Sequence, residues 1–175
     1  ANFQRHEAPV IHVRGVGEPI YLFQGVVSNF RSQPVLISWF GVQGDRIVSL
    51  SELHQLLSPT LSNPGDRFEA QPLEKKLPEA IKVAREHMEA ERQRRGRELG
   101  DLLRPDRRRS AAWEKKKKES FRALTDGSSL SAPERKRLER EKDEVARRVQ
   151  AWETWFQEAV QTSPNVYLRV GAVLI

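Results

Sequence analysis

The stretch PERKRLEREKDEVARRVQAWETWFQEAVQ, Pro133 to Gln161, decides how the rest of this chain can fold. Its apolar residues recur at intervals of three, four and seven, which places them along one face of an α-helix. Ser131 with Glu134 three residues later predicts a capping box, and Ser163-Pro164 cannot continue the helix. The apolar face consists of Leu138, Val145, Val149, Trp152, Phe156 and Val160.

This apolar face is thin in the first half of the helix and wide in the second. Charged residues surround Leu138, whereas the second half carries Trp152 and Trp155. We therefore expect the C-terminal half to dock on a core. The N-terminal half should project from that core and pack on only a thin partner element. Trp152 is expected to be buried and Trp155 to lie at the edge of the stripe, both as core residues rather than as base-stacking platforms.

A β-rich segment precedes the helices. Residues 20–28 and 34–42 are rich in β-branched and aromatic side chains, and 29–33 suit a hairpin loop of about five residues. Short strands are expected around Val10 and over 46–48. Because these strands are apolar at nearly every position, both faces of the sheet should be covered, and helices are the available material. The alternating run 166–175 is expected to pair with this meander.

Three further helices are expected over 51–57, 78–103 and 106–124, with 58–72 as an irregular connector. The last of them carries Trp113, Phe121 and Leu124 on one side, and the short loop 125–129 predicts antiparallel packing on the long helix. The fold class is therefore α+β: an antiparallel β-meander completed by the C-terminal strand, with a long protruding antiparallel helical hairpin. Residues 1–60 plus 164–175 form the β-rich core with a short helix, and 73–162 form a charged helical arm packed partly on it.

The amino-acid composition limits the kinds of chemistry and of cellular setting that this chain can have. The 175 residues include no cysteine, which excludes disulfides and thiolate chemistry and fits a cytoplasmic setting. No apolar run is long enough for a membrane span, so no membrane partner is expected. The chain begins Ala1-Asn2-Phe3 without a methionine, and we expect it to be a piece of a longer protein.

Catalytic signals are weak. The sequence holds no HExxH motif, no glycine-rich phosphate loop, and no serine in a nucleophile-elbow context. The histidines have no metal-ligand spacing. They are His6, His12, His54 and His87. We therefore expect no catalytic, cofactor-binding or metal-binding residue, and no enzyme activity within these residues.

The positive charge is concentrated in one stretch. Residues 104–122 hold nine basic and three acidic residues, an excess of six that equals the net charge of +6 for the whole chain. Such a surface attracts phosphate backbones, so we predict a DNA- or RNA-binding site, while a solvated helix face and an acidic protein partner remain alternatives. Four successive lysines cannot all face one groove, which argues against sequence-specific readout. The candidate nucleic-acid-binding residues are Arg107, Arg108, Arg109, Lys115, Lys116, Lys117 and Lys118.

Three segments together suggest a family. The run YLFQGVVSNFRSQPVLISWFGV, Tyr21 to Val42, the charged helical hairpin, and the closing NVYLRVGAVLI resemble the C-terminal region of bacterial Swi/Snf-type ATP-dependent helicases, which are related to the RNA-polymerase-associated ATPase. The ATPase motifs of that family do not occur here, so no ATP-binding residue can be carried over.

The resemblance implies a non-catalytic accessory domain of a helicase-like ATPase that helps its parent engage nucleic acid, RNA polymerase or another protein. The alternative hypothesis is a protein-interaction module whose exposed helical arm forms a coiled coil with a partner or a second copy. An apolar stripe satisfied within the chain would favour the first hypothesis, and an exposed one the second.

Overall fold

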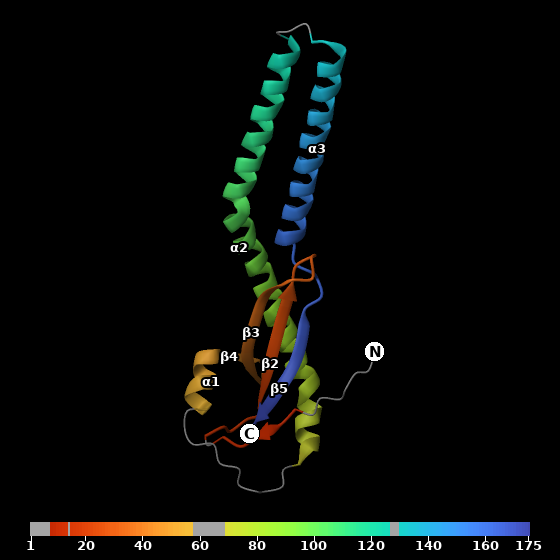
Figure 1. Ribbon diagram of the computed structural model, residues 1–175. Coiled ribbons are helices and arrows are strands. Elements are labelled where there is room, and N and C mark those ends of the chain that lie inside the picture. The colour runs from red at the N-terminus through yellow and green to blue at the C-terminus, as the bar shows by residue number, and fades with distance from the viewer. Residues whose placement is uncertain (1–7, 14, 58–68, 127–129) are drawn as a thin grey trace. The chain divides into compact units, whose positions relative to one another are not determined.

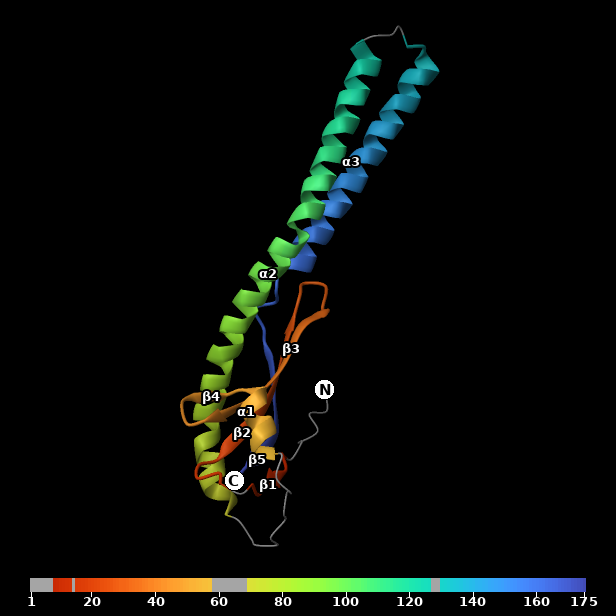
Figure 2. The same ribbon diagram turned by 90° about the vertical axis from the view of Figure 1, so that its left-hand side faces the viewer.

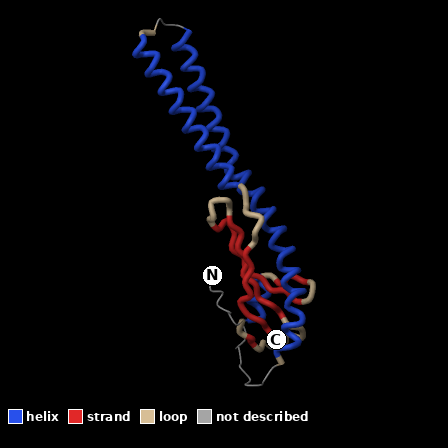
Figure 3. Tube along the Cα trace, turned by 90° about the vertical axis from the view of Figure 1, so that its right-hand side faces the viewer, coloured by secondary structure: helices blue, strands red, loops and turns tan. Residues whose placement is uncertain are grey.

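The computed structural model describes residues 8–13, 15–57, 69–126 and 130–175, which fold into two compact units. The sheet unit contains the described residues of Ala1–Ser28, Ser32–Arg95 and Ser163–Ile175. The helical unit contains Asn29–Arg31 and Gly96–Thr162. Figure 3 shows strands in the first unit and paired helices in the second, which confirms the α+β class.

The sheet has five strands in the order β1-β5-β2-β3-β4 (Figure 1). The C-terminal strand pairs with the N-terminal strands as predicted, but it lies between β1 and β2 and runs parallel to β1. The sheet is therefore mixed and not a pure meander. The place beside β2 is taken by the long β5, because β5 can pair along most of β2 whereas β1 has two residues. The strands are β1 (Val10–Ile11), β2 (Ile20–Ser28), β3 (Pro34–Gln43), β4 (Arg46–Val48) and β5 (Tyr167–Leu174).

One face of the sheet packs on the first part of helix α2 (Ala70–Asp126), up to Arg95. Ala80, Ala84 and Met88 of the helix are buried against the sheet. Gly25 permits the close approach, since a Cβ at that position would lie 2.4 Å from Met88 Sδ. The sheet residues in this core are Tyr21, Phe23, Val27, Phe40, Val42 and Val173.

Among the described residues, helix α1 (Leu50–Leu57) covers the other face of the sheet, and at one end only. Ser49 begins this helix with a capping box, because Glu52 Oε2 accepts the Ser49 N–H at 2.8 Å and Ser49 Oγ accepts the Glu52 N–H at 3.3 Å. Beyond α1 this face leaves three large side chains exposed, so the expectation that helices cover both faces is wrong there. They are Ile37 (57% exposed), Trp39 (46%) and Tyr167 (60%).

Helix α2 runs as one element of 57 residues, which corrects the prediction of two helices, 78–103 and 106–124, after a connector reaching residue 72. Pro72 lies in the first turn, where the missing N–H costs no helical hydrogen bond. Pro105 does remove one. The helix continues because residues on both sides of Pro105, such as Leu103 and Phe121, line the interface with the same partner helix. Residues 58–68 and 127–129 lie outside the described part of the chain.

The helical unit pairs the second part of α2 with α3 (Ala132–Val160), as the sequence predicts. The capping box is present, with Glu134 Oε2 accepting the Ser131 N–H at 2.8 Å. Arg107 contacts Glu153, and Lys117 contacts Glu141, so residue numbers rise along α2 as they fall along α3. The two helices are therefore antiparallel.

The apolar stripe of α3 is only partly buried. Phe156 is buried, but Trp152 and Trp155 are each 42% exposed, so the predicted burial of Trp152 is wrong. The reason lies on α2, where the residues that share a hollow with Trp152 are small or charged apart from Trp113. Leu124, predicted to share the inward side of α2, is exposed as well.

Candidate nucleic-acid interface

All seven candidate residues lie on α2 within the helical unit, and four of them form ion pairs. Two pairs are local to α2 and two join α2 to α3. The local pairs are Arg109 with Asp106 at 3.7 Å and Lys118 with Glu114 at 2.6 Å. The interhelical pairs are Arg107 with Glu153 at 3.3 Å and Lys117 with Glu141 at 3.8 Å.

Arg108, Lys115 and Lys116 form no ion pair with any described residue, and all three are exposed. Exposed ion pairs of the kind made by the other four contribute about 0–1 kcal/mol each, and salt screens them. The cations of α2 are therefore held weakly, and a stronger anion such as a phosphate can compete for them.

The helical period sorts these residues onto different sides of α2. At about 100° per residue, one group of basic side chains falls within an arc of about 40°. We call it the basic stripe: Arg104, Arg108, Lys115 and Arg122, all exposed. Arg109 and Lys116 lie about 100–140° around the helix from the stripe, and Lys117 points to Glu141 of α3.

The stripe has two members, Arg104 and Arg122, that were not among the seven candidates. Arg122 follows Lys115 by seven residues within the predicted helix 106–124, so helical periodicity alone could have found it, whereas Arg104 joins the stripe because α2 continues across Pro105. Arg104 pairs with Asp101. Asp101 and Glu119 lie beside the stripe, and their negative charges reduce its positive charge without cancelling it.

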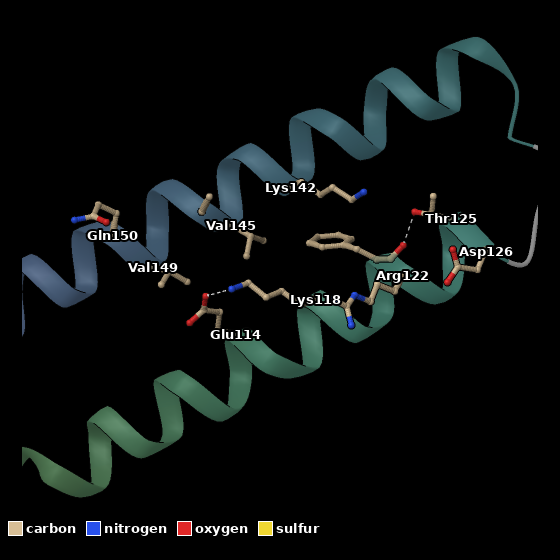
Figure 4. A pocket seen from close by; sticks show the side chains of 11 residues that line it. Glu114, Lys118, Arg122, Thr125, Asp126, Lys142, Val145, Val149 and Gln150 are labelled. Carbon is tan, nitrogen blue, oxygen red and sulfur yellow. Dashed lines mark hydrogen bonds and ion pairs between the residues drawn. The ribbon is translucent and has the colours of Figure 1, made fainter.

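An open hollow of about 600 Å³ lies between α2 and α3 near the end where the two helices connect (Figure 4). Phe121, Val145 and Val149 form its apolar wall. Figure 4 shows Lys118 and Arg122 from α2 and Lys142 from α3 around this wall. One member of the basic stripe, Arg122, therefore borders an apolar recess.

A second hollow, of about 310 Å³, lies further along the same helices. Here the guanidinium of Arg148 lies 5.5 Å from the centre of the Trp113 ring, within cation–π range. Trp152 lines the hollow, and its ring lies 5.1 Å from that of Phe156. Trp113 and Trp152 thus line a hollow beside a cation and remain partly open to solvent.

Comparison of the chain with protein-family models, with curated proteins and with solved structures finds no match. Among the described residues, no three His, Asp or Glu side chains gather as metal ligands would. Within the same part of the chain, no helix combines the length and apolar character of a membrane span. Function has to be inferred from the helical surface itself.

Proposed function

We propose that this chain is a non-catalytic accessory region of a helicase-like ATPase and that it contacts nucleic acid through the basic stripe of α2. The observation that carries the proposal is the alignment of Arg104, Arg108, Lys115 and Arg122 along one exposed face. Phosphate contacts position a protein on nucleic acid without reading its sequence, which suits an accessory region. The resemblance to Swi/Snf-type helicases adds the parent ATPase, and RNA polymerase or another protein as a further partner. The absence of cysteine fits a cytoplasmic setting.

The dimensions of the stripe suit a phosphate backbone. From Arg104 to Arg122 the helix rises about 27 Å at ~1.5 Å per residue. Phosphates of one strand of duplex DNA follow each other at about 3.4 Å along the axis, so this length spans roughly eight of them. Four cations over that length can neutralise up to four phosphates and release the associated counterions.

The proposal is tested with two variants that remove the same charges from different sides of α2. The stripe variant is Arg108→Gln with Lys115→Gln, and the matched control is Arg109→Gln with Lys116→Gln. Fluorescence anisotropy with labelled duplex and single-stranded DNA at low salt gives the affinities. We expect the stripe variant to bind more weakly, on the order of tenfold for each phosphate that is no longer bound, and equally so for all sequences. Equal affinities for the two variants would contradict the proposal.

A second candidate function is a protein-interaction module that binds a partner helix along the hairpin. It is favoured by one observation, the partial exposure of Trp113, Trp152 and Trp155, of which the first two line the hollow of about 310 Å³. Monomeric proteins seldom expose contiguous apolar surface that serves no partner. If the unmodified chain does not bind DNA at low salt but self-associates in sedimentation, and Trp152→Gln abolishes that association, this second function is the correct one.

A further inference from the structure

Strand β3 has a short free edge at Ile37 and Trp39. β4 pairs only with Gly41, Val42 and Gln43, at one end of β3. Gly44-Asp45 form a two-residue hairpin turn, so Gln43 and Arg46 are a hydrogen-bonded pair and alternate residues of β3 direct their N–H and C=O groups to the same side. Trp39 and Ile37 therefore direct theirs away from β2, toward the side where β4 has ended. The alternation ends at Val35, where the pairing of β3 with β2 has a register shift.

One contact limits the length of this edge. The Val35 carbonyl accepts a hydrogen bond from Arg95 Nε at 3.0 Å, so it is already bonded to α2. In the part of the chain that the structure describes, no strand pairs with Ile37 or Trp39 on the side away from β2. Figure 2 shows α1 near the β4 end of β3.

The free edge carries no charged residue of its own. Edge strands are commonly shielded by charged side chains, especially lysine, or by bulges and short length. Here such features lie only at one end of the edge, where Pro34, the register shift at Val35 and the Arg95 contact are found, and residues 36–40 are uncharged. Ile37 and Trp39 instead present apolar side chains on the face that α2 does not cover.

A groove continues from this edge. It has a volume of about 690 Å³ and lies between α1 and β3, with an almost wholly apolar lining that includes Leu22, Trp39, Leu50, Leu53 and Leu57. Leu50 is 62% exposed at the groove. The Trp39 side chain lies across the sheet, since a Cβ built on Gly171 of β5 would be 3.0 Å from Trp39 Cζ3.

We propose that the β3 edge and this groove bind an extended peptide segment of a partner protein as an additional strand. Its backbone pairs with the outward N–H and C=O groups of Ile37 and Trp39, and large apolar side chains at alternate positions contact the uncovered face and enter the groove. This site lies wholly in the sheet unit and goes beyond the nucleic-acid function proposed for the helical unit. A second copy of the chain fits less well, because its own Trp39 lies against Gly171 and is not free to fill the groove.

The test begins with a random peptide library displayed on phage and selected on the full chain. We expect the enriched peptides to carry large apolar residues at alternate positions and no proline between them. On binding, hydrogen exchange should slow at the amides of Ile37 and Trp39, while the Ser38 amide, which already pairs with β2, should not change.

Three exposed positions supply the variants. Ile37→Lys places a charge on the free edge and Leu50→Lys places one at the groove, and each should weaken peptide binding at least tenfold. Tyr167→Lys is the matched control on the same face, but on β5, and should leave binding unchanged. All three side chains are more than half exposed, so the variants should keep the fold, as circular dichroism will show.

Three outcomes would overturn the proposal. The first is that the selection enriches no peptide or enriches peptides without an alternating apolar pattern. The second is that binding is insensitive to both Ile37→Lys and Leu50→Lys. The third is concentration-dependent self-association of the chain that Ile37→Lys abolishes, which would assign the edge to a second copy.

Discussion

Gly25→Ala is predicted to destabilise the unmodified chain but to stabilise a chain in which Met88 has been shortened to alanine. In the unmodified chain the new methyl would lie 2.4 Å from Met88 Sδ and 2.8 Å from Cγ, with Met88 fully buried, so the side chain has little room to move. Overpacking of this kind costs about 1–3 kcal/mol. Removing a glycine from a strand gains about 0.5–1 kcal/mol through the unfolded chain. The clash is larger, and Gly25→Ala should destabilise the sheet unit by roughly 1 kcal/mol.

Met88→Ala removes the clashing atoms. Alone it should cost about 2–5 kcal/mol, as expected for shortening a fully buried methionine. In that background Gly25→Ala no longer meets Met88 and should stabilise the sheet unit by about 0.5–1 kcal/mol. Hydrogen exchange of the β2 amides measures the free energy of opening the sheet unit separately from the helical unit. The same effect of Gly25→Ala in both backgrounds would show that Met88 of α2 does not pack closely on the sheet at Gly25.

Three other predictions concern stability. Burial lowers the pKa of His87, whose ring lies 4.6 Å from Phe40, although Glu91 opposes the shift. As the pH falls, the unfolded chain therefore binds a proton at His87 before the folded chain does, and the sheet unit should lose stability as the pH falls through 6.5. Urea unfolding midpoints measured from about pH 7 to 5 should show this loss. His87→Leu should make the loss smaller. Phe156→Ala should cost about 3–5 kcal/mol and Trp152→Ala only about 1–2, because Trp152 is half exposed; similar costs in thermal unfolding would contradict the assignment. Deletion of 166–175 should unfold the sheet unit, since it removes the strand between β1 and β2, and an unchanged melting temperature would contradict this.

Local signals were sufficient to predict most of the elements. The β-branched runs predicted β2 and β3, and Ser131 with Glu134 predicted the start of α3, because a capping box is a short-range interaction. The continuity of α2 across Pro105 could not be predicted in this way. The cost of proline is local, whereas the compensating contacts of Leu103 and Phe121 with α3 depend on tertiary packing.

Burial was predicted less well than secondary structure. The spacing of Trp152 places it on the stripe of α3, but its exposure depends on which residues of α2 lie opposite. The same is true of Ile37 and Trp39, whose apolar character predicted a covering layer that the described chain does not supply. For the candidate site, the sequence located the basic segment, and only the continuity of α2 across Pro105 makes Arg104 part of one stripe with Arg108, Lys115 and Arg122.

The most direct test of the nucleic-acid proposal is the slope of log affinity against log salt for duplex DNA. Each phosphate contact contributes about −0.9 to this slope, so the stripe variant, which lacks Arg108 and Lys115, should have a slope smaller in magnitude by roughly 1.8. The control variant, which lacks Arg109 and Lys116, should keep the slope of the unmodified chain. Equal slopes for the unmodified chain and the stripe variant would show that the stripe does not bind phosphates.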